Sequence, residues 1–225
     1  MKKLKCYSLL ILLVLLSGLT SGQNVEFKKS NFKDQKVKYK SALNNFYLGN
    51  SLSVQGKYVK ALGHYLKANE FNPDNGFLNY KIGECYLNSP DKTKSIPYLE
   101  KAMELEPDAH ADMLYSLGWA YHLNAKWDTA VTEYTKFQKT LPAHALEKIA
   151  EVKRKISECD IGKELQQKPL NVKIENLGEI INSEYTDYVS TISADESILM
   201  FTSRRKARDG EEFDEYTYEY LEDIY

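Results

Sequence analysis

Four histidines are the residues of this sequence best suited to acid–base chemistry or metal binding: His64, His110, His122 and His144. The sequence contains no H-E-x-x-H pair, no G-x-S-x-G nucleophile turn, no G-x-G-x-x-G loop and no phosphate-binding loop. His110 with Asp112 is the nearest approach to a metal pair. Because a zinc site needs further ligands and none is near, we interpret this pair as surface side chains. The sequence thus predicts a non-catalytic protein without a metal or cofactor.

Two cysteines, Cys85 and Cys159, follow the first twenty-two residues, and neither belongs to a C-x-x-C motif. An oxidising compartment would allow a disulfide between them, but one pair does not establish it. We favour the alternative, in which both thiols are small buried apolar side chains.

Residues 1–22 have the layout of a secretory signal peptide. Three lysines precede an apolar run at residues 9–16, and small or polar residues follow to Gly22. Eight apolar residues are too few to cross a hydrocarbon core, which needs about 20, although a retained membrane anchor is the alternative interpretation. Cys6 precedes the apolar run, so it is not a lipid-acceptor cysteine. We expect cleavage after Gly22 and export to the periplasm or the outer-membrane periphery.

The charge of the remaining chain argues against nucleic acid as a partner. Residues 23–225 carry 27 basic and 32 acidic side chains, a net charge of −5. Residues 161–225 hold 7 basic and 15 acidic side chains, whereas residues 23–160 hold 20 and 17. Two regions of different character therefore meet near Cys159.

Three segments of the chain repeat one another, starting at Ala42, Gly76 and Ala111. The eighth residue of each is glycine: Gly49, Gly83 and Gly118. The twentieth is small: Ala61, Ser95 and Ala130. The twenty-fourth is large and apolar: Tyr65, Leu99 and Tyr134. The thirty-second is proline: Pro73, Pro107 and Pro142.

This pattern resembles the tetratricopeptide repeat, which implies stacked pairs of helices. The glycine and the small residue allow two helices to approach, the large residues fill the gaps, and each proline ends a helix. We therefore predict a mainly α fold, a tetratricopeptide α-solenoid with three helix pairs over residues 41–143. Pro97 is tolerable if its helix starts near Lys94, with Thr93 or Asp91 as the cap. The basic lead-in at residues 23–40 is a solvated helix or coil, or else a site for an acidic partner.

Residues 144–168 are predicted to contain an amphipathic helix that closes the stack, followed by a linker. Apolar residues recur every three or four positions: Leu146, Ile149, Val152 and Ile156. Phe137 stands where the other repeats have alanine, which suggests that the third repeat packs on something other than a fourth copy. A solenoid end needs such a capping element.

The first helices of the repeats are predicted to line a concave groove for a peptide or helix of a protein partner. The candidate partner-binding residues are Phe46, Asn50, Tyr80, Glu84, Tyr115, Trp119 and His122. In the alternative interpretation the aromatic rings pack between neighbouring first helices.

The region after Pro169 changes from helical to alternating periodicity, with Val172, Ile174, Ile198 and Met200 as candidate strand residues. It resembles the TolB-like propeller repeat at these residues: Tyr188, Ser193, Asp195, Phe201, Thr202, Ser203 and Arg204. The resemblance implies that residues 169–225 form a short, incomplete first blade, since a propeller has about four to eight blades. Asp195 is expected to order the turn. Arg204 is expected to pair with an acidic residue or a neighbouring blade, or to join a basic patch for a ligand.

The order of these segments resembles the front half of Bacteroidota envelope proteins that end in an OmpA-like domain. That resemblance implies an exported scaffold with a protein partner, in a longer protein that binds peptidoglycan through its C-terminal domain. Some members of that group serve in secretion or gliding. The alternative is an accessory region of a secreted propeller-containing hydrolase whose catalytic domain lies outside this sequence.

Overall fold

The computed structural model describes residues 22–107, 111–168, 170–206, 213–214 and 219–225. The predicted signal peptide falls almost wholly outside these residues, as does His110. Within the described part of the chain, no helix is long and apolar enough to cross a membrane.

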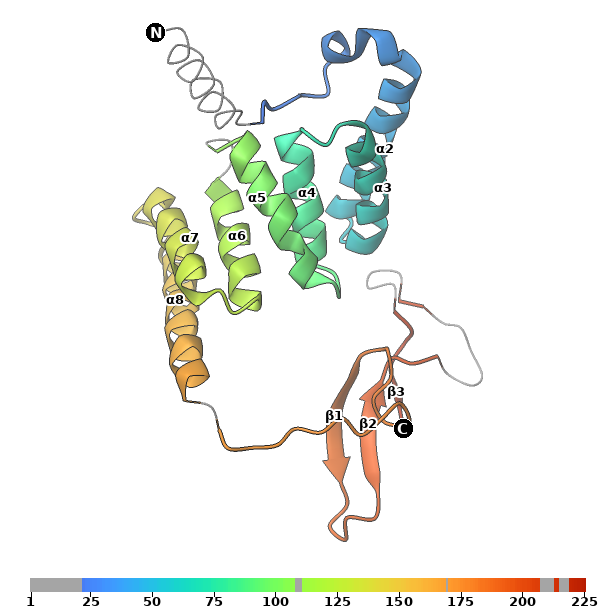
Figure 1. Ribbon diagram of the computed structural model, residues 1–225, viewed down its shortest axis with the longest axis vertical. Helices are drawn as coiled ribbons and strands as arrows, with labels where there is room; N and C mark the ends of the chain where they lie inside the picture. Colours follow the sequence, from blue (N-terminus) through green and yellow to red (C-terminus); the bar gives the residue numbers. More distant parts are fainter. Residues whose placement is uncertain (1–21, 108–110, 169, 207–212, 215–218) are drawn as a thin grey trace, which may run out of the picture.

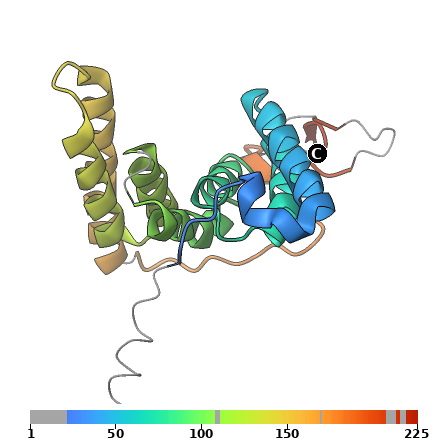
Figure 2. The same cartoon turned by 90° about the horizontal axis from the view of Figure 1, so that it is seen from above.

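Six helices form three antiparallel pairs that stand side by side in a curved row (Figures 1 and 2). The pairs are α2 (Lys36–Val54) with α3 (Tyr58–Phe71), α4 (Gly76–Leu87) with α5 (Ile96–Leu105), and α6 (Ala111–Leu123) with α7 (Trp127–Thr140). Two 3₁₀ turns precede the first and fourth of these helices: η1 (Lys29–Gln35) and η2 (Lys92–Ser95). The prediction of a mainly helical solenoid is confirmed.

Each repeat glycine lies against the large residue of its own pair. A Cβ on Gly49 would lie 2.6 Å from the ring of Tyr65, and a Cβ on Gly83 would lie 2.5 Å from Leu99. Gly118 is equally close to Tyr134, at 2.8 Å. No side chain fits at these distances, so the close approach predicted from the repeat pattern is confirmed in all three pairs.

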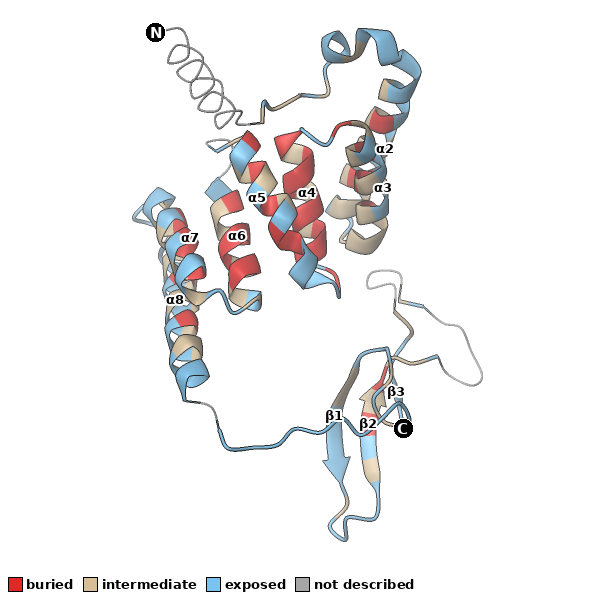
Figure 3. Cartoon of the chain, viewed as in Figure 1, coloured by how far each residue is buried: buried red, intermediate tan, exposed pale blue. Residues whose placement is uncertain are grey.

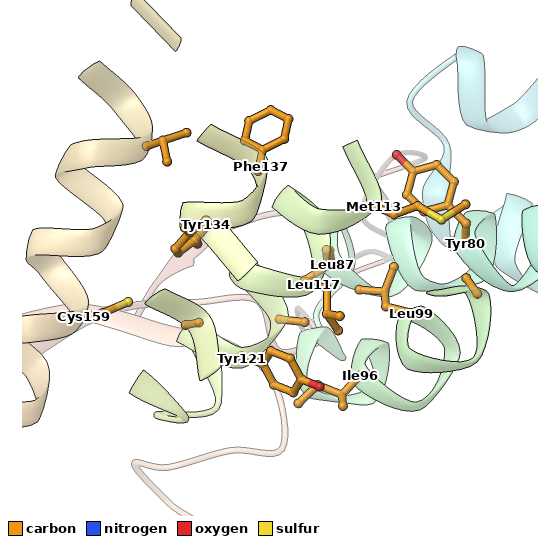
Figure 4. Close-up of a cluster of buried hydrophobic side chains, with 14 residues drawn as sticks. Tyr80, Leu87, Ile96, Leu99, Met113, Leu117, Tyr121, Tyr134, Phe137 and Cys159 are labelled. Carbon is orange, nitrogen blue, oxygen red and sulfur yellow. The ribbon is translucent and has the colours of Figure 1, made fainter. Parts of the chain in front are cut away.

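The small residues at the twentieth position of each repeat, Ala61, Ser95 and Ala130, are fully buried. Two apolar clusters fill the space between the helices. One cluster joins the first two repeats around Tyr65 and Ile82. The other, drawn in Figure 4, runs from Leu99 through Tyr134 to Cys159. Figure 3 shows that burial is densest along α4 and α6, the central helices of the stack.

Pro97 occupies the first turn of α5, as expected, but the predicted caps are absent. Asp91 forms an ion pair with Lys94 at 2.7 Å instead of capping a helix. The turn η2 explains the difference, because its backbone hydrogen bonds lead into the start of α5 without a side-chain cap.

Helix α8 (Leu146–Gln167) packs against α7 and ends the row. Val152 and Cys159 are buried on its inner face, whereas Leu146, predicted to pack, is 70% exposed. Phe137 of α7 is buried next to α8, and the ammonium of Lys148 on α8 lies 5.9 Å from the ring centre of Phe137. The third repeat thus packs on α8 rather than on a fourth copy. Both thiols are buried and free, and burial raises the pKa of Cys85 to about 12.

A small antiparallel sheet follows, with strand order β1 (Asp187–Ile192), β2 (Leu199–Ser203), β3 (Asp223–Ile224). In the β1–β2 turn, Asp195 accepts hydrogen bonds from the Ser193 hydroxyl at 2.6 Å and the Ser197 hydroxyl at 2.8 Å. These hydrogen bonds order the turn as predicted, and they lower the pKa of Asp195 to about 2.

Other expectations for this region need correction. Val172 and Ile174 are 65% and 92% exposed, and neither belongs to a strand, because within the described residues no strand pairs with this segment. The described residues form three strands, and the propeller itself stays a prediction. Arg204 pairs within the sheet region, with Glu219 at 3.4 Å and Glu222 at 2.6 Å.

Candidate protein-binding surface

The seven predicted groove residues lie on the first helices α2, α4 and α6, as the repeat pattern requires. Their side chains have different environments, and the aromatic rings among them contact neighbouring rings or the hydrophobic core. Phe46 is partly buried, with its ring centre 6.1 Å from that of Phe77 on the next first helix. This contact matches the alternative interpretation, in which the rings pack between neighbouring first helices.

Tyr80 is a core residue, only 6% exposed. Its hydroxyl donates to Glu84 at 2.7 Å, and the ammonium of Lys81 binds the other Glu84 oxygen at 2.7 Å. Burial, together with the Glu84 carboxylate, raises the pKa of Tyr80, so the phenol stays neutral. Tyr80 and Glu84 therefore have internal partners, and neither presents a free polar group to a ligand.

Asn50 serves the packing of the first pair. Its side-chain oxygen accepts a hydrogen bond from the hydroxyl of Tyr65 at 2.8 Å. Tyr65 is the large residue that lies against Gly49. This bond gives the buried phenol the partner that its hydroxyl needs away from water.

Tyr115 contacts the closing helix. Its hydroxyl donates to Glu151 of α8 at 2.5 Å, and the Lys148 ammonium lies 3.8 Å from its ring centre. That hydrogen bond lowers the pKa of Glu151 and keeps the carboxylate ionised. Helix α8 thus covers the end of the aromatic row.

The side chain of His122, on α6, faces groups of α7 and α8. Its ring meets those of Trp127 and Tyr134 edge-on, at 5.7 Å and 6.3 Å between centres. Burial lowers the pKa of His122, and the nearby Lys155 lowers it further, so the neutral form predominates at pH 7. Within the described residues, the Nδ1 of His122 and the hydroxyl of Tyr134 are buried without hydrogen-bond partners.

Among the predicted residues, Trp119 lines an open pocket. The pocket has a volume of about 370 Å³. One wall is the α4–η2 turn and the other belongs to the sheet region; the lining residues are Leu87, Asn88, Ser89, Pro90, Lys92, Trp119, Thr186 and Glu219. An indole beside amide, hydroxyl, lysine and carboxylate groups can hold an apolar side chain and bind its polar backbone.

Sequence reasoning missed the walls of this pocket. The turn at residues 88–92 carries the Asn-Ser-Pro signal of a loop, which marks it as exposed but not as a neighbour of Trp119. Thr186 and Glu219 come from beyond the linker, and their mutual hydrogen bond of 2.9 Å is a tertiary contact. Across the described ranges, no three His, Cys, Asp or Glu side chains gather as a metal site.

No family model matches this chain. The photosystem I assembly protein Ycf3 of Acaryochloris marina (strain MBIC 11017) is 33% identical to it over 88 residues. These residues are 38% of this chain and 52% of that protein, so the chain spans about half the length of the curated relative.

Two solved structures are similar to this chain. The NMR structure of the first TPR domain of the human RPAP3 protein has a TM-score of 0.44 and 19% identity, covering 54% of this chain and 96% of that chain. The crystal structure of the P58(IPK) TPR domain has a TM-score of 0.47 and 16% identity, covering 63% and 40%. The repeat spacing and the three glycine contacts described above indicate a tetratricopeptide-repeat fold for the helical region.

Proposed function

We propose that this chain is a non-catalytic scaffold that binds a protein partner in the cell envelope. The observation that carries the proposal is the Trp119 pocket, where a partly buried indole faces an open space beside the loop at residues 88–92. Large aromatic side chains in such settings are frequent anchors of protein interfaces. A peptide or helix of the partner inserts a side chain against Trp119 and continues along the first helices.

The location in the envelope rests on the sequence. Residues 1–22 are the export signal, and residues 169–225 begin a TolB-like propeller that continues in a longer, OmpA-like protein. That longer protein holds peptidoglycan through its C-terminal domain, and the repeats recruit a partner to it. Mass spectrometry of the native protein tests the export step: the N-terminal peptide should begin at Gln23, and a peptide that retains the segment before it would refute signal cleavage.

Site-specific photocrosslinking in living cells tests the partner site. A photoreactive phenylalanine derivative replaces Trp119 in one variant and the exposed Thr129 of α7 in a control. We expect a discrete adduct of higher mass from position 119 alone, with its partner identified by mass spectrometry. Equal adducts from both positions, or none from position 119 in a folded protein, would rule out this pocket as the binding site.

A further inference from the structure

Residues 23–28 form an irregular, non-helical segment, here called the N-terminal strap, that precedes η1 and lies along the loop between α3 and α4 (Figure 1). The backbone of Val25 is held on both sides. Its N–H donates to the carbonyl of Asp74 at 2.7 Å, and its carbonyl accepts from the side chains of Asn72 at 2.8 Å and Asn75 at 3.0 Å. The strap therefore binds through its backbone, as an extended peptide ligand does.

Both asparagines are buried with the strap in place, and Asn75 has a second partner that does not depend on the strap. They are 3% and 5% exposed, and the Asn75 oxygen caps α4 by accepting from the Leu78 N–H at 2.8 Å. That bond aims the remaining Asn75 amide at the strap. Preorganised donors of this kind lose little freedom on binding a carbonyl.

Asn24 and Phe27 add side-chain recognition. The Asn24 oxygen accepts from the Gly76 N–H at 3.0 Å, and its amide donates to Glu106. The Phe27 ring stacks on Phe46 with 5.3 Å between centres. Phe27 thus covers the residue that begins the aromatic row of the first helices.

Between and after these contacts the strap is solvated. Glu26, Lys28 and Lys29 are exposed, and the ion pair of Glu26 with Lys28 is a surface contact. Recognition is concentrated on Asn24, the Val25 backbone and Phe27. The motif that fits is asparagine, an extended residue, any residue, then an aromatic residue.

We propose that Asn72, Asn75, the Gly76 N–H and Phe46 form a peptide-recognition site, which the strap occupies in cis and which a partner protein occupies with an extended segment of the same motif. This inference deepens the proposed function, because it names the chemistry of one partner segment and a competitor within the chain. The tether through η1 keeps the strap at a high local concentration. Partner segments therefore bind well only when the strap contacts are weakened.

Fluorescence anisotropy with a labelled peptide of residues 22–30, GQNVEFKKS, tests the site in the full chain. The variant Asn24→Ala/Phe27→Ala weakens the contacts of the strap and leaves the residues of the peptide-recognition site unchanged. We expect this variant to bind the peptide at least about tenfold more tightly than the wild type. Adding Asn72→Asp, which replaces the donor amide by a carboxylate, should abolish that gain. Lys28→Ala/Lys29→Ala is the matched strap control and should leave binding unchanged.

The proposal is wrong if the Asn24→Ala/Phe27→Ala variant keeps its helical circular dichroism and binds no better than the lysine control. It is also wrong if the wild type forms dimers by exchanging straps, since the second occupant is then another copy.

Hydrogen exchange of the wild type gives an answer that needs no variant. The Val25 N–H should exchange at least about a hundredfold faster than the Ile82 N–H of α4, and equal rates would mean that the strap never leaves on its own. Because the peptide does not contact Trp119, this binding test can fail or succeed independently of the crosslinking test of the Trp119 pocket.

Discussion

At the scale of single residues, three glycines determine how closely the helices of each pair approach. Gly83 is the tightest of them, because Leu99 occupies the space where a side chain would lie. Gly63 is different: it lies on α3, and a Cβ there would meet nothing within 4 Å. The chain thus offers a packed helical glycine and an exposed one for comparison.

We predict that Gly83→Ala lowers the free energy of unfolding by about 1–3 kcal/mol, since the added methyl group must displace Leu99. Gly63→Ala should raise it by about 0.5–1 kcal/mol, because alanine has the higher helix propensity and no clash follows. Urea denaturation of the full chain, followed by circular dichroism, measures both. If Gly83→Ala left the free energy of unfolding unchanged or raised it, the contact of Gly83 with Leu99 would not limit the packing.

At the scale of elements, α8 takes the place of a fourth repeat. It covers Phe137 and Tyr115, and its Glu158 and Lys155 lie near His122 of α6. The groups that face His122 are Trp127 and Tyr134 from α7 and this ion pair from α8. A neutral imidazole in that position makes the docking of α8 sensitive to acid.

We predict that the urea midpoint of the helical unit falls as the pH decreases from 7 to 5. The pKa of His122 lies below its usual value of 6.5 in the folded state, so the unfolded chain binds the proton first and stability is lost below about pH 6.5. His122→Phe should reduce this decrease, because the ring is kept and the titration is removed. A pH dependence identical to that of the wild type would exclude His122 as its source.

At the scale of the whole molecule, a helical stack and a small sheet are joined by a linker that contacts little else. Leu170, Val172 and Ile174 are exposed in it, whereas Arg205 ties its far end to the sheet by donating to the carbonyl of Ile181 at 2.8 Å. The Trp119 pocket is bounded by both parts.

Limited trypsin digestion should therefore cut first at Lys173, within the linker, and leave the helical stack as a resistant fragment. Proteases need a segment that can be extended in their active site, and this one has no helix or strand hydrogen bonds to break. Lys173→Gln is the control and should delay that first cut. Early cleavage within α4 or α6 instead would show that the stack itself opens more readily than the linker.

The helical architecture could be predicted from the sequence because its determinants are local. The spacing of Gly49, Gly83 and Gly118 and of the following prolines encodes helix length, close approach and chain reversal within 34 or 35 residues. The site could be predicted only in part. The pattern places Phe46, Tyr80 and Tyr115 on the first helices, but it does not say which rings are covered.

Only the tertiary structure shows which residues of the first helices are covered and which distant segments meet. Asn72 and Asn75 meet Val25 across 47 and 50 residues, and Trp119 shares a pocket with Thr186 and Glu219 from beyond the linker. Alternation at Val172 and Ile174 likewise predicted a strand, and the described part of the chain supplies no strand to pair with it. The physical reason is the same in each case. The periodicity of a segment indicates which of its side chains can be buried. Its tertiary hydrogen bonds and pockets depend on which distant segment packs against it.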